Sequence, residues 1–106
     1  MTEQDKTFLS QIKQTMLAIE PSAEVVLFGS RARGDFHAES DWDLIVLSDK
    51  PKITIDNERQ IRHALFQIEL DYQQSISLMI YPKRDWNGKM SVIPLHQSVQ
   101  KEGILL

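Results

Sequence analysis

The first third of the chain shows a helical spacing of apolar residues followed by a strand-like run. From Asp5 to Ile19 apolar side chains recur every three or four residues, and Pro21 interrupts the pattern. This spacing predicts an amphipathic packing helix that ends before the proline. The next run, Ala23 to Phe28, is apolar, contains β-branched residues and ends at Gly29. It predicts a buried strand that enters a tight turn.

The same two patterns recur further along the chain. Asp43 to Leu47 predicts a second strand, and the polar residues 48–52 predict a turn after it. Ile55 to Tyr72 carries apolar residues at helical spacing among many charged ones, which predicts a second helix. Ile76 to Tyr81 predicts a third strand, which Pro82 ends.

The tail from Lys83 onward contains scattered apolar residues, and we expect short helices there with a stop at Gly103. The last three residues, Ile104 to Leu106, are apolar. We expect them to dock on the chain's own sheet; docking on another subunit of a homo-oligomer is the alternative. The predicted order is therefore α-β-β-α-β-α, a small α/β (α+β) domain with one mixed β-sheet flanked by helices.

Length and charge narrow the classes of protein that fit. A chain of 106 residues has room for one domain, residues 1–106, and none for a second lobe. Its formal net charge of −3 disfavours a general nucleic-acid binder. The absence of cysteine excludes a disulfide framework and a thiolate metal site. We find no signal-peptide pattern and no bilayer-spanning apolar run, so we expect a cytoplasmic protein without membrane contact.

Phosphate-binding chemistry is suggested where the first predicted strand ends. The strand runs into Gly29 and Ser30, and a strand that enters a Gly-Ser turn and then a short helix presents backbone N–H groups to a phosphate. Gly29 lets the backbone approach closely, and Ser30 adds a hydroxyl donor. We expect Arg33 to pair with a phosphate oxygen, with Arg31 as the alternative.

Two carboxylates lie at the start of the second predicted strand. Asp41 and Asp43 are two positions apart, so strand alternation puts them on one face, about 7 Å apart at Cβ. Trp42 and Leu44 then point the other way, into packing. Two such carboxylates can share Mg²⁺, which phosphates and water usually complete. A phosphate turn beside a carboxylate-held metal supplies most of what phosphoryl-type transfer needs.

The two segments together, Gly29-Ser30-x-Ala32-Arg33-Gly34 and Ser40-Asp41-x-Asp43-Leu44, resemble the signature of the DNA polymerase β-like nucleotidyltransferases. They are most similar to the minimal nucleotidyltransferase (MNT) type, the antitoxin half of HEPN/MNT toxin–antitoxin pairs. The resemblance implies the polymerase β-like fold, with ATP or another triphosphate as substrate. It also implies a nucleotide-binding set of Gly29, Ser30, Arg33 and Ser40, and Mg²⁺ held by the catalytic residues Asp41 and Asp43.

Antitoxin members of the family transfer a nucleoside monophosphate to a tyrosine hydroxyl on a partner HEPN ribonuclease, and the resemblance implies the same reaction for this chain. The family pattern has a third acidic residue on the next strand, but Ser77 stands at the expected place. Loss of such a base lowers rates by roughly 10²- to 10⁴-fold. The alternative function is therefore a catalytically degenerate antitoxin that neutralises its partner by binding alone. Glu69 and Asp71, just ahead of the third strand, are candidate substitutes for the acid.

A third hypothesis is a small-molecule nucleotidyltransferase like those that inactivate aminoglycosides, for which a second chain would have to complete the acceptor pocket. Other conspicuous residues receive structural interpretations. We expect Arg31 to be solvated unless it binds phosphate, Asp35 to serve a turn or helix cap, Trp42 to lie in the core and Trp86 to pack the tail on the sheet. The histidines are too scattered to indicate a metal site: His37, His63 and His96.

Overall fold

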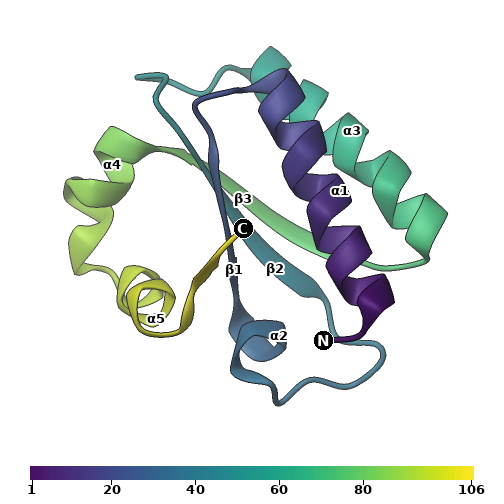
Figure 1. Ribbon diagram of the computed structural model, residues 1–106. Coiled ribbons are helices and arrows are strands. Elements are labelled where there is room, and N and C mark those ends of the chain that lie inside the picture. Colours follow the sequence, from purple (N-terminus) through teal and green to yellow (C-terminus); the bar gives the residue numbers. More distant parts are fainter.

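A four-stranded sheet in the order β3-β2-β1-β4 separates two layers of helices in the computed structural model, which describes all 106 residues (Figure 1). The central strand β1 is antiparallel to both β2 and β4, and β2 is parallel to β3. The elements are α1 (Glu3–Ile19), β1 (Glu24–Phe28), α2 (Gly29–Arg33), β2 (Trp42–Ser48), α3 (Ile55–Tyr72), β3 (Ile76–Pro82), α4 (Lys83–Asn87), the 3₁₀ helix η1 (Lys89–Val92), α5 (Pro94–Glu102) and β4 (Ile104–Leu105).

Helices α1 and α3 begin at matched capping boxes. The Thr2 hydroxyl accepts the backbone N–H of Asp5, whose carboxylate accepts the N–H of Thr2 in return. Thr54 and Asn57 repeat the arrangement at α3. These caps satisfy donors that the first helical turn leaves free. Helix α1 therefore begins two residues before the predicted start. The predicted bounds of α3 are confirmed.

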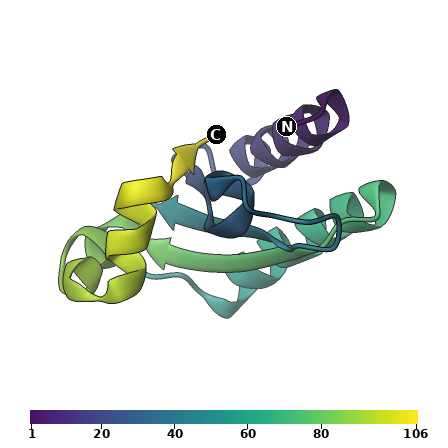
Figure 2. The same ribbon diagram turned by 90° about the horizontal axis from the view of Figure 1, so that it is seen from below.

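Strand β2 separates two apolar cores because its side chains alternate between the faces of the sheet. Trp42, Leu44 and Val46 face α1 and α3, and Trp42 is fully buried against Phe8, as expected for a core residue. The next residues along the strand face the other layer, where α4 and α5 close over a smaller core: Phe28, Ile45, Leu47, Trp86 and Val99. Figure 2 shows the sheet between these two layers.

The tail adds elements that the predicted order lacked. Trp86 lies between Tyr81 and His96 and packs the tail on the sheet, as predicted. Helix α5 ends before Gly103, also as predicted. The apolar end does dock within the chain, where it forms the short strand β4 beside β1. The predicted mixed sheet flanked by helices is confirmed, and no helix is long and apolar enough to span a membrane.

Candidate active site

The two motif segments meet because β1 and β2 are antiparallel neighbours. Phe28, the last residue of β1, pairs with Asp43 near the start of β2. The next residue, Gly29, has a φ of +74° and is buried. A Cβ at this position would collide with the Asp43 carboxylate. Glycine is therefore required twice, for the left-handed backbone and for the close approach of the carboxylate.

Burial and neighbouring charge both act on Asp43. Its side chain is partly buried, and burial is the main reason that its pKa is raised above the ordinary value; the charge of Asp41 raises the pKa further. The Arg33 guanidinium and a hydrogen bond from Ser77 act in the opposite direction, and Glu102 adds a smaller repulsion. A bound cation would reverse this balance, because an opposite charge favours the ionised carboxylate. This donor chemistry fits a divalent metal.

Asp41 lies one residue before β2 and is exposed. Trp42, between the two aspartates, is buried on the opposite face of the sheet, so the predicted alternation holds at this point. No group of three or more acidic, histidine or cysteine side chains is arranged to hold a metal ion. The two aspartates would therefore hold Mg²⁺ together with phosphate and water oxygens, which is its usual mode of binding.

Arg31 is not solvated as expected, and this interpretation was wrong. Its side chain is buried, with the residue only 6% exposed, and the guanidinium lies 4.5 Å from the Phe36 ring centroid and 4.3 Å from that of Trp42. The same group donates hydrogen bonds to the carbonyl oxygens of Ala38 (3.3 Å) and Ser40 (3.0 Å). These contacts use the planar fork and cation–π capacity of arginine. Arg31 thus holds the loop between α2 and β2 instead of reaching for phosphate.

Ser40 takes part in the same loop. Its hydroxyl accepts the backbone N–H of His37 at 3.0 Å, and its carbonyl accepts from Arg31. The hydroxyl proton can still be donated, since the bond to His37 uses only an oxygen lone pair. Both contacts fix the residue immediately before Asp41, so this loop sets the position of the first carboxylate.

Arg33 extends from the end of α2 and its side chain is 47% exposed. Its guanidinium is paired with Asp35 at 3.2 Å and with Glu102 at 3.3 Å. Asp35 is thus an ion-pair partner in the turn. Arg33 lies beside the Gly29 turn, as a phosphate-binding arginine must, but carboxylates occupy its donors in this structure.

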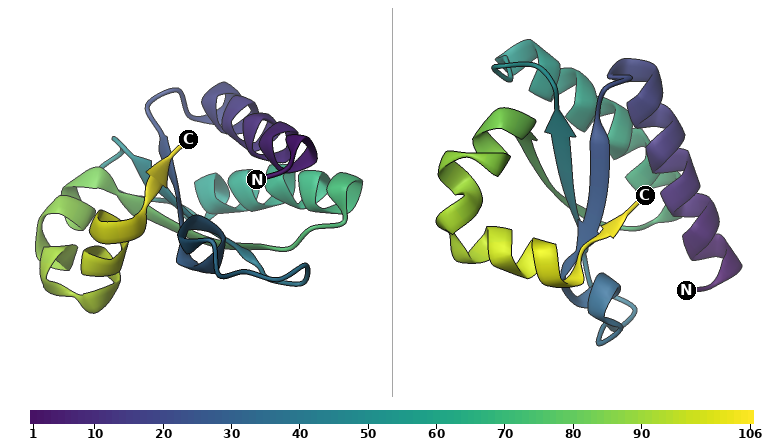
Figure 3. Two further views of the ribbon diagram at one scale, coloured as in Figure 1. Left: turned by 60° about the horizontal axis from the view of Figure 1, so that its bottom comes forward. Right: turned by 60° about the vertical axis from the view of Figure 1, so that its left-hand side comes forward.

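Glu102 is the site residue that the sequence did not indicate. One of its carboxylate oxygens accepts the Gly29 N–H at 3.2 Å, across 73 positions of sequence. Figure 3 shows the end of α5 beside the start of α2, at the same end of the sheet. No local motif marks Glu102, because only the docking of β4 brings the end of α5 to this place.

The chain matches the family model described as "Nucleotidyltransferase domain" over residues 9–98, a stretch that contains both motif segments. The chain belongs to this nucleotidyltransferase family. It is 41% identical over 59 residues to the Methanocaldococcus jannaschii protein named "Putative protein adenylyltransferase MJ0141". That stretch covers 56% of this chain and 59% of the relative, which is less than two thirds of the relative's length.

Two solved structures share the fold of this nucleotidyltransferase domain. A structure described as a toxin-antitoxin with AMP-PNP superimposes with a TM-score of 0.65 at 20% identity, covering 91% of this chain and 69% of the other. One described as a putative minimal nucleotidyltransferase gives a TM-score of 0.63 at 21% identity, covering 95% and 94% of the two chains. The expected nucleotidyltransferase fold is therefore confirmed.

In this nucleotidyltransferase domain Ser77 lies next to Asp43, since the two residues are paired in the β2–β3 register. The candidate substitutes for an acid at this place are directed elsewhere. The Glu69 carboxylate accepts the backbone N–H of Ile76 at 2.8 Å, and Asp71 is exposed. Both residues belong to α3, which packs on the face opposite Asp43. The geometry therefore supports neither Glu69 nor Asp71 as the missing acid.

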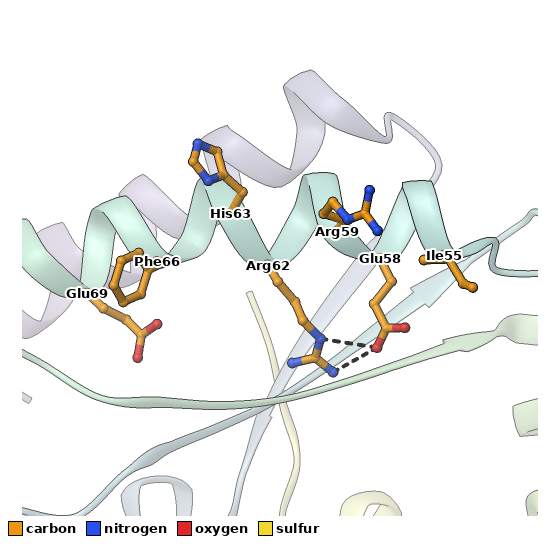
Figure 4. Close-up of a pocket in the computed structure, with 7 residues that line it drawn as sticks. All are labelled: Ile55, Glu58, Arg59, Arg62, His63, Phe66 and Glu69. Carbon is orange, nitrogen blue, oxygen red and sulfur yellow. Dashed lines mark hydrogen bonds and ion pairs between the residues drawn. The ribbon is translucent and has the colours of Figure 1, made fainter.

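A shallow surface pocket lies along the outer side of α3, away from these motif residues (Figure 4). Glu58 and Arg62 form an ion pair at 3.0 Å within it, and Phe66 is exposed at its other end. The pocket contains none of the residues around Gly29 and Asp43. The candidate active site is thus defined by the paired ends of β1 and β2 and by the end of α5.

Proposed function

We propose that this domain is a Mg²⁺-dependent nucleotidyltransferase that transfers AMP from ATP to a hydroxyl group on a partner protein. The observation that carries the proposal is the close approach of Gly29 to the Asp43 carboxylate, which supports a phosphate-binding turn directly beside a metal-binding carboxylate. Membership in the nucleotidyltransferase family supports the reaction type. The relative named as a protein adenylyltransferase supports AMP as the group and a protein as the acceptor.

Different residues of the chain would bind the triphosphate and the metal. The Gly29 N–H, the Ser30 hydroxyl and the Arg33 guanidinium would hold triphosphate oxygens, and the Ser40 hydroxyl would add a donor. Asp41 and Asp43 would hold Mg²⁺. When bound, the metal supplies charge neutralisation on the phosphates and orients them for attack. Trp42 and Arg31 keep the two aspartates in position from the opposite face of β2 and from the loop.

The transfer itself balances as an exchange of one phosphorus–oxygen bond for another. The acceptor hydroxyl oxygen bonds to the α-phosphorus, the bond from that phosphorus to the bridging oxygen breaks, and pyrophosphate leaves. The hydroxyl proton must be taken up by a base, and β3 offers Ser77 beside Asp43 instead of an acid. We therefore propose that this proton passes to water or to a group of the partner.

The partner we propose is a HEPN-domain toxin with a tyrosine as acceptor, as the motif resemblance implies. The structural neighbour described as a toxin-antitoxin with AMP-PNP agrees with a role of this kind. Ser77 favours the second candidate function, an antitoxin that holds nucleotide but neutralises its partner by binding alone. The two functions differ in whether the partner leaves the complex covalently modified.

Intact mass of the partner separates the two functions. The protein encoded by the adjacent gene, tested as the proposed HEPN partner, would be co-expressed with the wild type, with Asp43→Asn, or with Asp49→Asn as a matched control at the other end of the sheet. We expect the wild type and the control to add one or more AMP units and Asp43→Asn to add none while still forming the complex. An unmodified partner in a stable wild-type complex would favour binding alone, and modification by Asp43→Asn would refute the metal assignment.

A further inference from the structure

The carboxylate of Glu102 accepts from two of the four donor groups that the proposed function assigns to phosphate. It accepts the Gly29 N–H at 3.2 Å and the Arg33 Nη1 at 3.3 and 3.4 Å. Asp35, the other carboxylate on Arg33, contacts only the Nε atom of that side chain. Glu102 therefore joins the two donor groups in a way that a phosphate oxyanion would, since both are anionic acceptors.

We propose that Glu102 occupies the phosphate position of the Gly29 turn in the nucleotide-free domain and must leave it when a Mg²⁺-bound triphosphate binds. This inference rests on the proposed function. The exchange replaces one charge-assisted contact with another, so Glu102 lowers nucleotide affinity without blocking the site. A nucleoside without phosphate does not compete with Glu102 for these donors, so the contact lowers the affinity for the triphosphate and not the affinity for the nucleoside.

The backbone around Glu102 is held firmly, which limits the movement to its side chain. The Gly103 N–H donates to the Val99 carbonyl at 2.8 Å, and the Leu106 N–H donates to the Val25 carbonyl at 2.9 Å. Between these bonds, β4 pairs with β1. The Glu102 side chain is 18% exposed. Rotation of its torsions toward solvent would free Gly29 and Arg33 while the end of α5 stays in place.

The arrangement is different from that of a third metal-binding acid. Glu102 is directed at the Gly29 N–H and at Arg33, whereas the family's third acid belongs on β3, where Ser77 pairs with Asp43. Glu102 does not form a metal-binding group with the two aspartates. Its removal should therefore strengthen nucleotide binding, whereas removal of a metal ligand would weaken it.

The test is calorimetric titration of the full chain with Mg²⁺ and AMP-PNP. We expect Glu102→Ala to lower the Kd by about fivefold to tenfold and Glu102→Gln to give an intermediate value. Asp35→Asn is the matched control, because it removes one charge and one Arg33 partner but leaves the Gly29 contact; we expect a change of about twofold or less. The Gly29 amide proton resonance of the nucleotide-free protein should shift in Glu102→Ala and not in Asp35→Asn, with the remaining spectrum showing a folded chain.

The outcomes separate this inference from the function on which it rests. Weaker binding by Glu102→Ala would overturn the inference and identify Glu102 as a metal-holding acid. An unchanged Kd, or an unchanged Gly29 resonance, would overturn it as well while leaving the proposed nucleotide site intact. A wild type and a Glu102→Ala variant that both fail to bind the nucleotide would refute the proposed function itself.

Discussion

The two ends of the sheet each hold a partly buried carboxylate, in opposite surroundings. Glu20, just after α1, is 9% exposed; burial raises its pKa, but the Ser22 and Ser48 hydroxyls and the Lys50 ammonium outweigh burial and hold the pKa below its ordinary value. Asp43 at the other end has a raised pKa, because burial first and Asp41 second outweigh the opposite effects of Arg33 and Ser77. The charged form of Glu20 is therefore favoured by its neighbours within the chain, whereas the charged form of Asp43 is disfavoured, which agrees with the proposed cation site.

The difference favours a structural role for the Glu20 end of the sheet and supports the proposed ligand-binding role of the Asp43 end. Glu20 accepts hydrogen bonds from Ser22 at 3.0 Å and Ser48 at 3.1 Å, and Lys50 lies at 3.4 Å. Groups of the chain itself therefore supply the hydrogen bonds and the counter-charge that the Glu20 carboxylate needs. At the other end burial and the charge of Asp41 disfavour the charged form of Asp43, and such perturbed carboxylates are typical of functional sites. A substitution at each end should therefore have opposite effects on binding and on stability.

The largest expected effect is the loss of nucleotide binding on substitution of Asp43. Asp43→Asn should weaken Mg²⁺-dependent binding of AMP-PNP by about 10²-fold, because one of two carboxylate ligands loses its charge. Glu20→Gln should leave the Kd unchanged, since Glu20 lies at the far end of β2 from the site. Titration calorimetry of both variants measures the contrast, and equal Kd values for the two would remove the functional distinction between the ends.

Gly29→Ala should break the same site through the backbone. The positive φ and the collision with Asp43 together should lower the free energy of unfolding by about 2–4 kcal/mol and abolish nucleotide binding. Gly34→Ala is the matched control, because Gly34 also has a positive φ, +90°, but nothing lies within 4 Å of its added Cβ. Gly34→Ala should lower the free energy of unfolding by only about 1 kcal/mol, because it adds backbone strain without a collision. Urea unfolding measures both, and equal losses would show that the Asp43 contact contributes nothing.

The Glu20 end should show its effect in stability. Glu20→Gln keeps the size of the side chain but replaces one acceptor oxygen with an NH₂ donor. The hydrogen bond from the Ser22 or Ser48 hydroxyl must then rearrange, and the attraction to the Lys50 ammonium is lost. We expect a decrease of about 1–2 kcal/mol in the free energy of unfolding at neutral pH. Because the folded pKa of Glu20 is lowered, its contribution to stability is present above the unfolded pKa and is lost as pH falls through the folded pKa.

Glu58→Gln is a surface comparison for this effect. It breaks a half-exposed ion pair with Arg62 and should lower the free energy of unfolding by about 0.5 kcal/mol or less, measured by the same urea unfolding.

The helices and strands could be predicted from the sequence where the residues that determine them lie within the element. Periodicity located α3 and the three longer strands to within two residues, because hydrophobic alternation and the flanking proline and capping residues lie within each element. These elements follow from neighbours along the chain. Ser77 was singled out through the family resemblance, which implies an acid on the third strand, and the register pairs this residue with Asp43.

The missed parts depend on contacts across the chain. Arg31 was predicted as solvated because its acceptors are the backbone carbonyls of residues 38 and 40, whose positions follow from the path of the loop and from no residue type. Glu102 reaches Gly29 only because α5 packs over the sheet and β4 pairs with β1. Its partners are a backbone N–H and an arginine, and neither gives a pattern in the sequence around residue 102.

The smallest expected effect is a pH dependence that has opposite signs at the two ends. The folded pKa of Asp43 is raised, so its stabilising contribution is full below the unfolded pKa and is lost as pH rises through the folded pKa. Asparagine stays neutral throughout. Without metal, Asp43→Asn should therefore gain stability relative to the wild type as pH rises. Glu20→Gln should instead lose stability relative to the wild type as pH rises.

Urea unfolding of both variants and the wild type between about pH 3 and pH 8 measures these slopes, since the range spans the ordinary aspartate and glutamate pKa values. Mg²⁺ and AMP-PNP added at the upper end should stabilise the wild type and not Asp43→Asn, because only the folded wild type binds them. A wild type that gains stability over Asp43→Asn with rising pH in the absence of metal would mean that the chain itself satisfies the Asp43 charge, and the two ends of the sheet would then be alike.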